Sequence, residues 1–159
     1  MIKEHGRYEK FTPLRYGGGD KYTISWAYTP KDDKRGSWYT ETLKGKPSME
    51  AIQNCILDFY NDKVDQEILS GFTWNGMQVW LSSENQFNYK AAFDAAVQSQ
   101  GANLPIKFKF GTNIKPIYHT FYDLNEFSDF YMKAIAHIQK TLEKGWEEKD
   151  KINWEIYNF

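Results

Sequence analysis

Histidine, cysteine and paired carboxylates are the residues through which this chain could carry out metal, nucleophilic or acid–base chemistry. The three histidines stand far apart, at His5, His119 and His137. None belongs to an HxH, an HExxH or another spacing that is typical of a metal site. The sequence therefore predicts no metal site, with one arrangement left open: His119 and His137 would meet if a hairpin packed beside a helix.

Nucleophilic and acid–base catalysis also lack a signature. The chain contains no GxSxG elbow, and its single cysteine, Cys55, lies in an apolar helical pattern without a base partner. The nearest carboxylate pairs, Asp58 with Asp62 and Glu147 with Glu148, are typical of solvated helix faces. We therefore expect a non-enzymatic protein without a cofactor, and a cell-wall hydrolase is the enzymatic alternative.

The charge composition argues against two classes of partner. The 20 basic and 21 acidic residues are interspersed and give a net charge of −1, so no long-range field would attract nucleic acid or an anionic membrane. Lys107, Phe108 and Lys109 suggest a nucleic-acid stacking platform, but on a strand the lysines face away from the phenylalanine. No run approaches the ~20 apolar residues of a membrane span, so we expect a soluble protein without a leader.

The elements that must position these residues begin with a hairpin. Residues 1–20 have no sustained period, which predicts an arm or a loop. Residues 22–29 alternate aromatic and polar side chains, which is typical of a half-buried strand, and residues 38–43 can return beside it. A Lys-Gly-Lys-Pro turn then marks the expected boundary. We predict an N-terminal arm and β-hairpin in residues 1–47 and a second domain in residues 48–159.

A helix and a second hairpin follow. Ser48 is a good N-cap for an amphipathic helix that Ser70-Gly71 closes. Asn75-Gly76 is the strongest short-range hairpin signal in the chain, because a type I′ turn needs positive φ at both central residues. We therefore expect residues 72–74 to pair with residues 77–81.

The next part of the chain repeats the order of helix and hairpin. Ser83 with Gln86 predicts a capping box at the start of a helix that Gly101 ends. Residues 106–110 alternate apolar and lysine side chains, and a turn leads from them to residues 117–121. This pattern predicts another β-hairpin.

The last part of the chain predicts its longest helix. Asp123 with Glu126 forms a second capping box, and apolar residues from Leu124 to Leu142 recur at helical spacing. Gly145 either ends or weakens this helix, and the aromatic residues at 154–159 should dock on this chain or on a partner. The predicted fold is α+β, with two β-hairpins packed against two to three α-helices after an N-terminal aromatic hairpin.

Four motifs in the part of the chain from Gly71 to about Ile152 carry a family resemblance. They are G-F-x-W-N-G-x-x-V-W-L-S at Gly71–Ser82, E-N-Q-x-N-Y-x-A-A at Glu84–Ala92, L-P-x-x-F-K-F-G at Leu104–Gly111, and L-x-x-G-W at Leu142–Trp146. With these motifs the chain resembles a domain-of-unknown-function family that recurs in structural and tail- or tail-fibre-associated proteins of tailed bacteriophages and prophages. The resemblance brings no catalytic residues.

The resemblance implies a virion component of the head, connector, tail or tail fibre. Such a protein is made in the host bacterial cytoplasm and works in the virion in several copies, bound to other virion proteins and to copies of itself. Aromatic residues make up 18% of the chain, and they build cores but are also favoured at interfaces and sugar platforms. The interface candidates are Trp26, Trp38, Trp154, Tyr157 and Phe159.

Two other functions stay open at this point. Exposed rings that stack on a surface glycan would make the chain a carbohydrate-binding host-recognition module. A transient role would instead make it an assembly chaperone that is absent from the mature particle.

Overall fold

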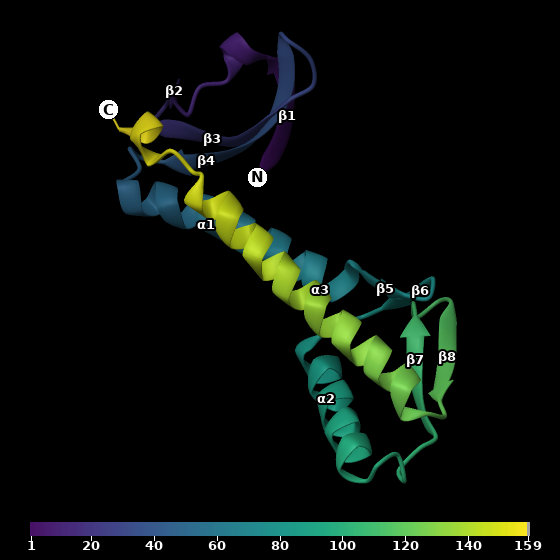
Figure 1. Ribbon diagram of the computed structural model, residues 1–159. Helices are drawn as coiled ribbons and strands as arrows, with labels where there is room; N and C mark the ends of the chain where they lie inside the picture. Colours follow the sequence, from purple (N-terminus) through teal and green to yellow (C-terminus); the bar gives the residue numbers. More distant parts are fainter. Residues whose placement is uncertain (159) are drawn as a thin grey trace. The chain divides into compact units, whose positions relative to one another are not determined.

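A computed structural model describes residues 1–158, which form three α-helices and eight strands in small antiparallel sheets (Figure 1). The helices are α1 (Met49–Ser70), α2 (Ser83–Gln98) and α3 (Leu124–Asp150), with the short 3-10 helices η1 (Tyr8–Lys10) and η2 (Trp154–Tyr157). The strands are β1 (Ile2–Arg7), β2 (Leu14–Gly18), β3 (Lys21–Pro30), β4 (Arg35–Lys44), β5 (Phe72–Trp74), β6 (Met77–Val79), β7 (Ile106–Gly111) and β8 (Pro116–Phe121). The fold is α+β, as the sequence predicts.

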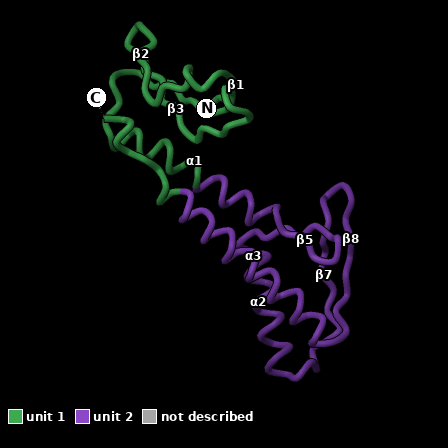
Figure 2. Tube along the Cα trace, turned by 45° about the horizontal axis from the view of Figure 1, so that its top comes forward, with its two compact units in different colours: residues 1–60, 149–159 green, residues 61–148 purple. Residues whose placement is uncertain are grey.

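The chain forms two compact units, which Figure 2 shows in different colours. The first contains residues 1–60 and the C-terminal residues from Lys149 onward, and the second contains residues 61–148. The units therefore divide within α1 and α3, and not at the turn before Ser48 where the sequence suggested a boundary. The reason is that the first half of α1 supplies apolar side chains to the core of the first unit.

The first unit is built on a four-stranded antiparallel sheet with the strand order β1-β4-β3-β2. The prediction of an arm or a loop in residues 1–20 is wrong, because β1 pairs with β4 and β2 pairs with β3. Both are edge strands whose side chains are exposed or only half-buried. A strand with no fully buried face has no alternation of apolar and polar residues, so its sequence gives no period to detect.

The C-terminal segment completes the core of this first unit. Tyr157 is buried together with Ile24, Trp26 and Ile56. Its hydroxyl donates a hydrogen bond of 2.8 Å to the carbonyl of Ser25. The expectation that the aromatic C-terminal residues dock on this chain or on a partner is confirmed for Trp154 and Tyr157, which pack on this chain.

The second unit packs two hairpins against α2 and α3. Asn75 and Gly76 have φ values of 47° and 75°, as the type I′ turn between β5 and β6 requires. The core contains Phe121, Phe127 and Phe130, which are fully buried. Their rings lie 4.8 to 6.4 Å apart between centroids, within the range in which aromatic pairs attract each other beyond their buried area.

Two of the three predicted helix caps are confirmed. The hydroxyl oxygen of Ser48 accepts a hydrogen bond of 3.1 Å from the backbone N–H of Ala51. A carboxylate oxygen of Asp123 accepts one of 2.9 Å from the N–H of Glu126. Each bond satisfies an N–H group that the first helical turn leaves unpaired.

The third cap lies one residue earlier than predicted. Ser82, and not Ser83, is extended and accepts a hydrogen bond of 3.2 Å from the N–H of Asn85. The side chain of Gln86 donates instead to the carbonyl of Leu81. Either of the two adjacent serines could act as the N-cap. The hydrogen bond from Gln86 to Leu81 favours the earlier one, Ser82.

Gly145 neither ends nor interrupts α3, which continues to Asp150. A Cβ atom at this position would overlap Cγ2 of Val64 on α1. Both residues belong to the second unit, so glycine here permits the close approach of two helix backbones. Val64 has little freedom to move away, because a β-branched side chain in a helix is restricted to one main rotamer.

The substitution Gly145→Ala is expected to lower the free energy of unfolding. Alanine gains about 1 kcal/mol of helix propensity over glycine, but overpacking against Val64 costs about 1–3 kcal/mol. The double variant V64A/G145A should lose less free energy of unfolding than the two single variants lose together, because alanine at position 64 removes the overlap. Urea denaturation of the unmodified chain, the two single variants and the double variant would measure this difference. A more stable G145A protein would contradict the close approach.

Candidate functional site

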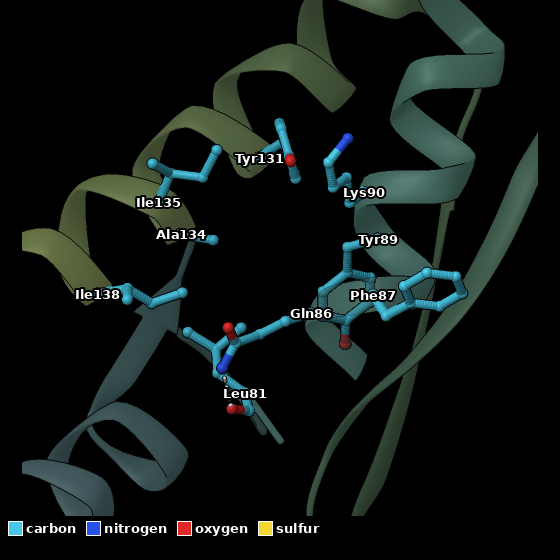
Figure 3. Close-up of a pocket in the computed structure, with 9 residues that line it drawn as sticks. All are labelled: Leu81, Gln86, Phe87, Tyr89, Lys90, Tyr131, Ala134, Ile135 and Ile138. Atoms are coloured by element: carbon cyan, nitrogen blue, oxygen red, sulfur yellow. Dashed lines mark hydrogen bonds between the residues drawn. The ribbon is translucent and has the colours of Figure 1, made fainter. Parts of the chain in front are cut away.

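An apolar groove between α2 and α3 is the best-formed concave site of the second unit (Figure 3). Its volume is about 220 Å³. This exceeds the roughly 150 Å³ of an apolar cavity that accepts a benzene ring. The groove is lined by Leu81, Gln86, Phe87, Tyr89, Lys90, Tyr131, Ala134, Ile135 and Ile138.

The two walls of the groove follow from helical spacing. Tyr131, Ile135 and Ile138 lie on one side of α3 and belong to the apolar stripe that the sequence predicts. Ile135 is 41% exposed, and Phe87 on α2 is 71% exposed. The apolar stripe of α3 therefore extends beyond the residues that pack in the core. Its exposed residues line the groove.

Two titratable groups that line the groove, Tyr89 and Lys90, have raised pKa values. Burial raises the pKa of Tyr89 to about 12. A hydrogen bond from Lys90 to Asp94, together with the attraction between their charges, raises the pKa of Lys90. Neither group is therefore poised to exchange a proton near neutral pH, and the groove is suited to binding apolar groups.

A second hollow of about 490 Å³ combines an aromatic ring with amide side chains. Trp80, at its edge, is 46% exposed. The side-chain nitrogen of Asn85 donates a hydrogen bond of 2.8 Å to the carbonyl of Trp80, and Gln78 and Asn113 also line the hollow. An exposed indole beside polar side chains is suited to stacking on a sugar ring while amides bond its hydroxyls.

Two of the three histidines, His119 and His137, have separate hydrogen-bond partners. Nε2 of His119 lies 2.9 Å from Oε1 of Glu126, and Nε2 of His137 lies 3.0 Å from the carbonyl oxygen of Glu67. Within residues 1–158, no three His, Cys, Asp or Glu side chains gather as metal ligands. Cys55 is half-buried in the first unit, where burial raises the pKa of its thiol. None of the helices described is both long and apolar enough to cross a membrane.

The structure corrects three of the predicted interface residues. Trp26, Trp38 and Tyr157 are only 2–3% exposed, so they belong to the interior of the first unit. Trp154 is partly buried against the same core, and Phe159 lies outside the described residues.

The sequence could not show that both faces of the first sheet are covered. Trp26 lies on one face, where its ring packs against Phe59 of α1. Trp38 lies on the other face, against Phe11 and Tyr28. An alternating strand indicates which residues share a face, but it does not indicate whether a distant segment folds over that face.

Three other aromatic or apolar residues of the second unit are strongly exposed. Tyr118 is 60%, Tyr122 is 74% and Ile114 is 91% exposed. Tyr118 pairs with Lys109 across the hairpin, on the face opposite to the core. The sequence contained a signal for this exposed ring. Tyr118 is aromatic at a strand position where the alternation predicts a polar residue.

Comparisons with known proteins give no assignment for these sites: no family model, curated protein or solved structure matches the chain.

Tyrosine ionisation should make the stability of the second unit depend on alkaline pH. Burial raises the pKa of Tyr89 from 10.0 to about 12, so the folded state favours the neutral phenol. This contribution is complete below the unfolded pKa and is lost as pH rises through the window between the two values. Tyr89→Phe should therefore reduce the fall in the free energy of unfolding above about pH 10, measured in urea titrations.

The exposed Tyr122 offers a matched control for this measurement. Tyr122→Phe should leave the fall in the free energy of unfolding at alkaline pH as it is in the unmodified chain. An equal slope in the Tyr89→Phe protein and the unmodified chain would contradict the link between burial and ionisation.

Proposed function

We propose that this chain is a non-enzymatic bacteriophage structural protein that acts through protein–protein interfaces, with other virion proteins and copies of itself as partners. The phage assignment is supported by the resemblance of residues 71–152 to virion-associated proteins. The interface assignment is supported by one observation, the exposed apolar edge of the β7–β8 hairpin. The edge surface consists of Ile114, Tyr118 and Tyr122, together with Ile117 on the opposite face of β8.

The backbone of β8 supports an interface because one of its edges is unpaired. Among the residues described, β8 pairs only with β7. Its other edge presents N–H and C=O groups to which a strand of a partner can add. A free edge that carries apolar side chains favours association.

The side chains of the edge surface support an interface by their size. Each aromatic side chain can bury about 150–250 Å², so Tyr118 and Tyr122 with the two isoleucines would supply roughly half of the ~800 Å² that one partner buries in a standard interface. The nearby groove, with the exposed Phe87 and Ile135, lies in the same unit and offers further apolar area.

The composition of purified particles tests the proposed function. Phage particles produced by the host that encodes this chain would be purified on a gradient and quantified by mass spectrometry. We expect the chain in a fixed ratio to the major capsid protein that matches a symmetry of the particle. Its absence would contradict a structural role and favour the assembly chaperone.

The edge surface can be tested by substitution. Y118S/Y122S should lower incorporation into particles by about tenfold or more, because the loss of central aromatic contacts costs more than 1 kcal/mol in many interfaces. Tyr8 and Tyr16 in the first unit are 60% and 63% exposed, so Y8S/Y16S is the matched control. Equal incorporation of the two double variants would exclude the edge surface as the interface.

A second candidate function, recognition of a surface glycan, is favoured by the hollow at Trp80. Saturable quenching of tryptophan fluorescence by a sugar would support it, since Trp80 is the half-exposed ring beside the amides. Trp80→Ala should then abolish the quenching. Quenching that persists in this variant would place the sugar elsewhere, and no quenching with a broad glycan panel would remove this candidate.

A further inference from the structure

A pair of like charges lies where β1 meets β4 in the first unit. The strand register places Arg7 directly opposite Arg35. Like charges in this arrangement destabilise a sheet, unless an anion lies between them. Neither guanidinium is within 4.0 Å of a carboxylate in residues 1–158.

Two further cations line a hollow at this place. The hollow, of about 620 Å³, is lined by His5, Gly6, Arg7, Lys10, Lys31, Arg35 and Gly36. Four of these side chains carry a positive charge at neutral pH and none carries a negative charge. The ammonium groups of Lys10 and Lys31 also lack a carboxylate partner within residues 1–158.

The carboxylate of Asp32 is hydrogen-bonded within the turn that follows β3. Oδ1 of Asp32 accepts hydrogen bonds of 2.9 Å and 2.8 Å from the backbone N–H groups of Lys34 and Arg35. These bonds hold the turn, and Asp32 does not line the hollow. The carboxylate of Asp32 attracts Arg35 and Lys31 from outside the hollow, so it offsets at most one of the four positive charges.

Backbone hydrogen bonds connect the segments that carry the cations, whose side chains are exposed. The N–H of Lys31 donates to the carbonyl of Arg35 at 2.8 Å, and the N–H of Tyr8 donates to the carbonyl of Lys34 at 2.9 Å. On the side of the sheet where Trp38 packs, its ring leaves little space beyond Gly6. The segments that carry the cations are thus fixed before any ligand arrives, which reduces the entropy lost on binding.

We propose that this basic hollow binds a diphosphate group. Planar guanidinium groups match phosphate oxygens with paired hydrogen bonds, and the two arginines face one another across the strands. One phosphate monoester carries about 1.5–2 negative charges at neutral pH, so a single group would leave uncompensated at least one of the three positive charges that Asp32 does not offset. Two adjacent phosphate groups match them, whether as inorganic pyrophosphate or as the diphosphate of a nucleotide.

Calorimetric titration of the full-length chain tests this site. Inorganic pyrophosphate, ADP and adenosine would be titrated in a phosphate-free buffer with about 0.1 M NaCl, which screens distant charges. We expect one pyrophosphate per chain and no binding of adenosine. Equal affinity for ADP would identify the diphosphate as the whole ligand, and higher affinity would identify a nucleotide. The absence of binding by both phosphate compounds would overturn the proposal.

Substitutions distinguish binding in this hollow from a general attraction of pyrophosphate to positive charge. R7Q/R35Q should weaken pyrophosphate binding by about tenfold or more. Lys21 and Lys44 form another directly opposed pair of cations in the same sheet, outside the hollow. K21Q/K44Q removes the same charge, so it should leave the affinity nearly unchanged. An equal loss of affinity in both double variants would overturn the proposal.

A second pair of substitutions guards against an effect on folding. K10Q/K31Q changes the two lysines and leaves the cross-strand arginines in place, and it should also weaken binding by about tenfold. Wild-type amide shifts in NMR spectra should change around Arg7 and Arg35 when pyrophosphate is added. Shifts confined to residues outside the hollow would contradict the assignment.

Discussion

The burial of aromatic rings is the constraint on which both units of this protein depend. In the second unit, Phe121, Phe127 and Phe130 are fully buried and in contact with one another. In the first unit, Trp26 packs on α1, and Tyr157 returns from the end of the chain to the same core. Because rings contribute large areas per residue, these few positions fix which surfaces remain for function.

Local chemistry in the sequence predicted the elements well. The Asn75-Gly76 turn, the Ser48 cap and the Asp123 cap involve residues at most four apart, so their outcome depends on backbone geometry that a short segment determines. The edge strands in residues 1–20 form by pairing with other strands, and their sequence shows no alternation of apolar and polar residues that would predict them. The overlap between Val64 and a side chain at position 145 likewise involves segments that the sequence alone does not bring together.

The candidate sites were harder to predict because exposure is a property of the whole fold. Trp26 and Trp38 are covered from opposite faces of one sheet, whereas Tyr118 stands on an uncovered face of another hairpin. A net charge of −1 also hid the basic hollow, since the opposite charges are distributed elsewhere on the chain. The register that opposes Arg7 and Arg35 is visible only after the strands are paired.

The two units thus present different surfaces, a basic hollow in the first and an apolar strand edge in the second. The central claim is that the edge surface of β8 is the site of assembly. Amide hydrogen exchange of the free chain and of the chain in purified particles tests it most directly. We predict slower exchange in residues 117–121 of the assembled chain, because a partner strand would bond those N–H groups of β8 that do not bond to β7. Unchanged exchange there, with protection confined to the first unit, would contradict the account.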